Sequence, residues 1–246
     1  MKPTILTRRR LLAGAGAAGL ASVTGLSLLT DDALGYTHSA TITGASEVSL
    51  QSDWRATHNG RVVSKSGDGV ETTDDGATAT VQNVLPGDTG TLSFQVTPES
   101  EDGEAPNVQP ELTLELTETA ENGLTEPERK AGDDDRDEGE LQDYLEVEVW
   151  YDTGIMGVEA FGGDNGTQDP REGLVDPEAE GTLAEVADAL DDIAIGGCLG
   201  EGEDPLAVTM RWEFPDEQED QNVTQGDSVE FDVVLVPEQC DEGGGQ

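Results

Sequence analysis

The chain has 246 residues, a formal net charge of −42 and only 4% aromatic residues. Asp and Glu are spread over almost every segment beyond Asp31, where Lys65 and Lys130 are the only lysines. This balance excludes a nucleic-acid-binding surface, since there is no basic patch to neutralise phosphates. It is typical of a protein adapted to high salt, because at about 1 M ionic strength the Debye length is only about 3 Å and an acidic coat hardly repels itself. An acidic protein from an ordinary salt habitat is the alternative.

The first 35 residues are predicted to be an export signal. A paired arginine precedes two apolar residues, which is the twin-arginine pattern formed here by Arg8, Arg9, Leu11 and Leu12. The apolar run that follows is rich in Ala and Gly, so it is a weak membrane anchor despite its length. Small residues before the Gly35–Tyr36 bond fit a cleavage site. We therefore expect a secreted, extracellular or cell-surface protein, which contacts a membrane only if this signal stays uncleaved.

The body of the chain is predicted to consist of β-strands. Seven segments alternate apolar and polar residues, and they span 47–51, 77–84, 91–98, 111–119, 144–152, 206–214 and 228–237. A period of two with one apolar face is typical of strands that bury one side. The pattern predicts an all-β fold, an antiparallel jelly-roll-like β-sandwich, as a single domain over residues 36–240. The last residues, 241–246, are expected to form a disordered tail.

One segment has helical spacing instead. Apolar residues recur at helical intervals over residues 182–194, Thr182 and Glu185 can form a capping box, and Gly196-Gly197 is expected to end the helix. One amphipathic helix packed on the sandwich is the simplest interpretation, with a partner-binding helix as the alternative. Three polar stretches, 99–107, 121–140 and 162–181, are predicted to be acidic loop insertions.

The sequence predicts one disulfide and no enzyme. Cys198 and Cys240 are the only cysteines, and an even pair in an exported chain favours a bridge over two unrelated thiols. Neither they nor His38 and His58 have the spacing of a zinc site. The sequence contains no GxSxG, no HExxH and no phosphate-binding glycine loop. We therefore predict no catalytic residue, no metal site and no cofactor.

Two weaker patterns lie in the predicted loops. Asp133, Asp135 and Asp137 have the spacing of cation ligands, but Glu138 stands where a calcium loop needs glycine. Weak cation association is one interpretation of this run, and a solvated charge run is the other. Asn165 and Asn222 begin acceptor sequences for N-glycosylation, which makes them candidate sites in an exported chain.

Parts of the chain resemble a known family. Four features are similar to the TasA/camelysin-like family of secreted matrix and pilus subunits. They are the arginine-led signal with its Gly/Ala-rich run, the segment "VQNVLPGDTGTLSFQV" (81–96), the helix at 182–200 and the block 210–240. The last block is the most specific, through Trp212, Pro215, Asn222, Gln225, Asp227, Ser228, Phe231, Gln239 and Cys240. The chain departs from the family at the signal junction, where it has "LGYTHSAT" instead of an "A-Y-F-S-D" run.

The resemblance implies a subunit that self-associates into extracellular filaments, pili or a biofilm matrix by donating its N-terminal segment to the next copy. The donor segment would be residues 36–48, with Tyr36, Ala40 and Ile42 as inward residues. Main-chain hydrogen bonds would supply affinity, as in other forms of strand addition. The alternative is that the segment pairs within its own sandwich, in a monomeric cell-surface adhesion or binding module.

Overall fold

The computed structural model describes residues 35–44, 48–63, 69–99, 107–154, 163–200, 203–216, 218 and 220–240. The chain divides into two compact units, residues 1–31 and 32–246, and all described residues belong to the second. The predicted export signal with its arginines and the predicted tail at 241–246 lie outside the described residues. None of the helices in the described part of the chain is long and apolar enough to cross a membrane.

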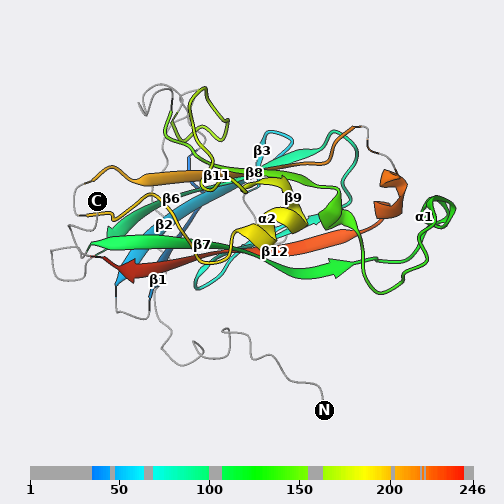
Figure 1. The fold of residues 1–246 in the computed structure, drawn as a ribbon, viewed down its shortest axis with the longest axis horizontal. Coiled ribbons are helices and arrows are strands. Elements are labelled where there is room, and N and C mark those ends of the chain that lie inside the picture. The colour runs from blue at the N-terminus through cyan, green and yellow to red at the C-terminus, as the bar shows by residue number, and fades with distance from the viewer. Residues whose placement is uncertain are drawn as a thin grey trace, which may run out of the picture. The chain divides into compact units, whose positions relative to one another are not determined.

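Two antiparallel sheets form the sandwich (Figure 1). The first, sheet A, has the order β1-β2-β6-β11-β8-β9, with β3 paired to β2. Its strands are β1 (His38–Thr43), β2 (Ser49–His58), β3 (Arg61–Val63), β6 (Thr89–Glu99), β8 (Glu146–Tyr151), β9 (Glu180–Thr182) and β11 (Leu206–Glu213). The second, sheet B, has the order β10-β7-β12-β5-β4. Its strands are β4 (Val70–Thr72), β5 (Gly76–Gln82), β7 (Val108–Ala120), β10 (Ile193–Ala194) and β12 (Ser228–Gln239). The predicted all-β sandwich is confirmed.

The core lies between the two sheets and is built by the predicted alternation. Leu92, Phe94 and Val96 of β6 are buried on one side, and Leu112 and Leu114 of β7 face them from sheet B as part of the same cluster. Each such side chain contributes roughly 1.5–3 kcal/mol when it is removed from water. The strand residues between these positions are polar, and they form the two outer faces.

Strand β2 is longer than predicted. The sequence indicated a strand over 47–51, whereas β2 extends to His58 and then turns at Asn59-Gly60 into β3. Buried and exposed residues do not alternate over the second half of β2. Arg55 and Thr57 on its outer face are buried, as are Trp54 and Ala56 on its core face. Another segment of the chain covers this outer face, as described below.

The predicted helix is shorter than expected. Helix α2 spans Leu183–Ala189, and its capping box of Thr182 and Glu185 is present as predicted. It ends before Gly196-Gly197, because the next residues return to sheet B: Ile193 and Ala194 pair with β7 as strand β10. The apolar spacing predicted that Ile193 belongs to the helix, but its backbone pairs with β7 instead.

A second helix and two short 3-10 turns lie outside the predicted elements. Helix α1 (Glu126–Ala131) interrupts the predicted loop at 121–140, and it begins with a capping box formed by Thr125 and Glu128. The 3-10 turns are η2 (Leu141–Asp143) and η4 (Gln221–Thr224). α1 packs against η4 near the end of the sandwich where β12 begins (Figure 1).

The predicted disulfide is confirmed. Cys198 and Cys240 are bonded, with their Cα atoms 6.1 Å apart. The bridge joins the segment after β10 to the end of β12, and both lie beside Val108 at the start of β7. The disulfide therefore closes one corner of sheet B covalently.

Candidate functional site

Strand β1 is the end strand of sheet A. It pairs residue for residue with β2, from His38 opposite Trp54 to Thr43 opposite Ser49. Residues 44–48 alone connect the two strands, and the Gly44 amide donates to the Val48 carbonyl at 2.9 Å. The predicted donor segment therefore forms an edge strand of its own sandwich, paired with β2, and its residues 45–47 lie outside the described part of the chain.

The inward face of β1 is seated in the core. Ile42 is 2% exposed and belongs to the main apolar cluster. The His38 ring stacks on the buried Trp54 ring, with centroids 3.9 Å apart, and burial lowers the pKa of His38. Ala40 lies between them, half-buried. Removal of β1 would uncover the Trp54 ring and the site of Ile42.

The outward face of the same strand pair is polar. The Thr41 hydroxyl donates to the Gln51 carbonyl oxygen at 3.3 Å, and the Gln51 amide donates to the Ser39 hydroxyl. The hydroxyls of Thr43 and Ser49 are 2.9 Å apart. Such exposed hydrogen bonds contribute little net free energy because water can replace them, so the core contacts and the backbone ladder hold β1.

Tyr36 does not occupy the inward position that the sequence indicated. Its hydroxyl donates to Asp164 Oδ1 at 2.6 Å, and its ring lies 5.1 Å from the Arg55 guanidinium carbon. Arg55 lies between the core residues of β2 and therefore points to the outer face of sheet A. The chain leaves strand geometry before His38, so Tyr36 anchors β1 on the outer face, and His38 takes the inward position instead.

Residues 163–169, here named the cover loop, cross the outer face of sheet A. Arg55 is 1% exposed, donates to the Asp164 carbonyl at 2.7 Å and pairs with its carboxylate at 3.1 Å. Burial raises the pKa of both Asp164 and the Tyr36 hydroxyl. The guanidinium opposes this effect at Asp164, because it favours the ionised carboxylate. Tyr36, Asp164 and Arg55 thus join the start of β1 to the cover loop.

A buried carboxylate fixes the other side of the cover loop. Asp152 is 1% exposed and accepts hydrogen bonds from the Gly166 amide at 2.8 Å and the Thr209 hydroxyl at 2.8 Å. The Ser93 hydroxyl lies 2.8 Å from the same Thr209 oxygen. The loop therefore rests on a polar layer between itself and the sheet, which explains why Arg55 and Thr57 are buried.

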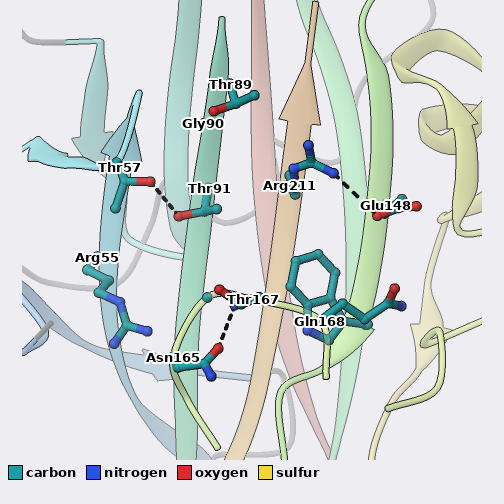
Figure 2. Close-up of a pocket in the computed structure, with 13 residues that line it drawn as sticks. Arg55, Thr57, Thr89, Gly90, Thr91, Glu148, Asn165, Thr167, Gln168 and Arg211 are labelled. Carbon is teal, nitrogen blue, oxygen red and sulfur yellow. Dashed lines mark hydrogen bonds and ion pairs between the residues drawn. The ribbon is translucent and has the colours of Figure 1, made fainter. Parts of the chain in front are cut away.

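A polar groove of about 460 Å³ lies beside the cover loop (Figure 2). Asn165, Thr167 and Gln168 of the loop border it on one side, and outward residues of sheet A border it on the other. Arg211 projects into it and lies 3.9 Å from Glu148. Hydroxyl, amide and guanidinium groups line this groove together with the Glu148 carboxylate and Trp150.

The two candidate glycosylation sites differ in access. Asn222 is exposed in η4, but Thr224 of its acceptor sequence is buried. Asn165 is half-buried at the groove, and its side-chain amide donates to Asp169 at 3.1 Å. Gly35, before the predicted cleavage point, is exposed. Glycosylation and cleavage stay predictions.

The acidic run does not place its three aspartates around one point. Asp135 is exposed, and its carboxylate accepts the amides of Arg136 and Asp137 in a tight turn. Asp133 instead forms a group with Glu121 and Glu140, and Glu121 also forms a second group with Glu128 and Asp227. This is the place among the described residues where side chains could hold a metal ion.

Sequence reasoning missed the residues that anchor β1 and the cover loop. The sequence analysis did not single out Arg55 or Asp152, because a strand's alternation does not reveal that a distant loop covers its polar face. The signal for them in the sequence is weak: Arg55 is a lone cation beside Trp54 in a strongly acidic chain.

The comparisons with known proteins give no identification. No protein-family model matches the sequence, and no curated protein matches it.

Proposed function

We propose that this chain is an extracellular structural subunit that polymerises by exchange of its N-terminal strand. The observation that carries the proposal is the position of β1, which makes an unbroken antiparallel ladder with β2 and is joined to the domain by residues 44–48 alone. A strand of the same sequence from a second copy can form the same ladder and fill the same sites. Head-to-tail exchange of this kind produces an open filament.

The cost of exchange is small for a physical reason. β1 can separate from β2 while the pairing of β2 with β6 is left intact. The incoming strand restores the stack on Trp54 and the burial of Ile42, so it packs on the domain as the original strand did. Assembly then depends on concentration, and also on salt, because the net charge of −42 makes copies repel one another until the charge is screened.

The test locks β1 onto its own chain. Thr41 and Gln51 are direct partners on the outward face, and opposite residues in an antiparallel pair lie about 4.5–5.5 Å apart, within the range of a disulfide. We expect the oxidised Thr41→Cys/Gln51→Cys protein to stay monomeric at about 1 M salt, where the acidic coat is screened. The matched control is Thr41→Ser/Gln51→Ser, which we expect to form filaments visible by electron microscopy.

Two outcomes would contradict the proposal. The first is filament formation by the locked protein, because its β1 cannot leave. The second is a lack of filaments in the control and in the unmodified mature chain at high concentration and high salt. Deletion of residues 36–43 should also abolish assembly while leaving a folded domain, which circular dichroism checks.

A monomeric cell-surface binding module is the second candidate. The observation that favours it is the polar groove beside the cover loop, together with Tyr36 anchored in that loop by Asp164. In this case β1 stays in its own sheet, and the groove binds a polar ligand at the cell surface. Replacement of Arg211 and Gln168 by Ala should then reduce adhesion, whereas the Thr41–Gln51 lock should not.

A further inference from the structure

Five carboxylates gather at the end of the sandwich where β7 ends and β12 begins. Glu121 follows the last residue of β7, and Asp227 precedes the first residue of β12, so the paired strands bring them side by side. Helix α1 supplies Glu128, and the segment after it supplies Asp133 and Glu140. We name these five residues the acidic cluster.

Three members of the cluster are buried, although carboxylates normally face water, and Asp133 and Glu140 are half-buried. Glu121 and Asp227 are each 2% exposed, and Glu128 is fully buried. The five take no part in the ion pairs found among the described side chains. Burial of ionised carboxylates without a compensating charge is very costly, so the cluster needs either protons or a cation.

Three of the five carboxylates use one oxygen to fix their position. Asp227 Oδ2 accepts the Glu140 amide at 2.7 Å, Asp133 Oδ1 accepts the Asp135 amide at 2.9 Å, and Glu128 accepts the Thr125 amide in the capping box. The oxygens that are buried without a hydrogen-bond partner are Glu128 Oε1, Asp227 Oδ1, Asp133 Oδ2, Glu140 Oε2 and both oxygens of Glu121.

The five carboxylates form two groups of three that share Glu121. One oxygen each from Glu121, Glu128 and Asp227 lie within 4.8 Å of one another, and so do oxygens of Glu121, Asp133 and Glu140. Oxygens that bind one Ca²⁺ at 2.3–2.6 Å are separated by at most about 5 Å, so each group of three carboxylates is close enough to share one ion. An all-oxygen, all-carboxylate set is also the ligand type that hard cations prefer.

We propose that the acidic cluster is a calcium site, in which Glu121, Glu128 and Asp227 are the central ligands and Asp133 and Glu140 complete the shell. The inference is independent of the proposed filament. The bound ion joins the insertion at 121–140 to the start of β12, because its ligands come from both. The insertion approaches β7 and Asp227 closely at Gly139, where a side chain would not fit. A Cβ at this position would lie 2.8 Å from both the Asp227 carboxyl carbon and the Ala120 carbonyl oxygen.

The test is calorimetric titration of the mature chain with CaCl₂ in chelator-treated buffer at fixed high NaCl concentration. We expect one Ca²⁺ per chain and Mg²⁺ binding that is at least about tenfold weaker. Asp227→Asn and Glu121→Gln should each weaken calcium binding about tenfold or more. Glu126→Gln, whose side chain is 73% exposed on α1, and Asp135→Asn in the exposed turn are matched controls and should bind calcium as the unmodified chain does.

A second measurement does not depend on the folding of any variant. Calcium should raise the thermal unfolding temperature of the unmodified chain, and a chelator should reverse the rise. The proposal is overturned if calcium gives no heat of binding in the calorimetric titration and does not change the unfolding temperature. That result would mean that protons alone neutralise the cluster. Equal weakening by the control substitutions, or Mg²⁺ binding as tight as Ca²⁺ binding, would also overturn it.

Discussion

The two side edges of the sandwich are closed in opposite ways. At one side, β9 of sheet A and β10 of sheet B are linked through α2, which packs against β7, β8 and β9, and the Cys198–Cys240 bond ties the chain after β10 to β12. At the other edge of sheet A, a single six-residue strand, β1, pairs with one neighbouring strand. The first edge is closed by apolar packing and a covalent bond, and the second by the β1–β2 ladder, the burial of Ile42 and the Tyr36–Asp164 hydrogen bond.

The largest effect is expected at the covalent edge. Removal of the disulfide in Cys198→Ala/Cys240→Ala opens a loop with a sequence separation of 42. In the chain-entropy treatment this costs about 4 kcal/mol of unfolding free energy. Chemical denaturation measures the loss, and we expect filament formation to survive wherever the variant is folded. A folded variant that no longer assembles would show that the two edges are not independent.

The next comparison uses one apolar residue from each edge. Leu190 at the end of α2 is fully buried, and Ile42 in β1 is 2% exposed. Leu190→Ala should lower global stability by roughly 2–5 kcal/mol. Ile42→Ala removes a side chain of similar size, but the cost is limited by release of β1, so global stability should fall less than in Leu190→Ala.

Limited proteolysis separates the two cases. Ile42→Ala should give rapid cleavage near the N-terminus and weaker filament assembly, whereas Leu190→Ala should give cleavage only as the whole domain unfolds. If Ile42→Ala instead unfolds the domain as completely as Leu190→Ala, β1 is an integral strand, and the exchange proposal loses its basis.

A smaller effect is expected at the anchor of β1. Tyr36→Phe removes the hydroxyl that donates to Asp164, while Arg55 still pairs with that carboxylate. The free energy that holds β1 on the domain should fall by about 1 kcal/mol, and the fall is measured as faster amide exchange over residues 37–43. Thr41→Val, on the exposed outward face, is the control and should leave exchange unchanged.

The smallest effect is expected from pH. Burial lowers the pKa of His38 in the folded state below its ordinary value, so in mildly acidic solution the unfolded or released strand binds more protons than the docked strand. Docking of β1 should therefore weaken as the pH falls from about 7 to about 5.5, through the ordinary histidine pKa of about 6.5. Protection of β1 amides at both pH values, compared with His38→Gln, checks this. We expect β1 protection in His38→Gln to be independent of pH over this range. If the pH dependence is unchanged in this variant, a group other than His38 causes it.

The sequence by itself determined the sandwich, its main strands and the disulfide. Segments such as 91–98 and 228–237 bury one face, and period-two alternation is a local property that only a half-buried strand satisfies. The capping box at Thr182 likewise fixed the start of α2, since the residues that satisfy the first helical amides are adjacent in sequence. The pairing of Cys198 with Cys240 followed because the chain has no other cysteine.

Only the tertiary structure decided where the candidate sites lie. Helix α2 ends at Ala189 because Ile193 pairs with β7. Tyr36 faces outward because the cover loop places Asp164 on the outer face of sheet A. Glu121 and Asp227 are far apart in the sequence, and the pairing of β7 with β12 brings them together in the acidic cluster. No sequence motif has ligands at such a spacing. In a chain with 54 acidic residues, sequence alone cannot distinguish a buried carboxylate from a solvated one, because burial depends on what packs against it.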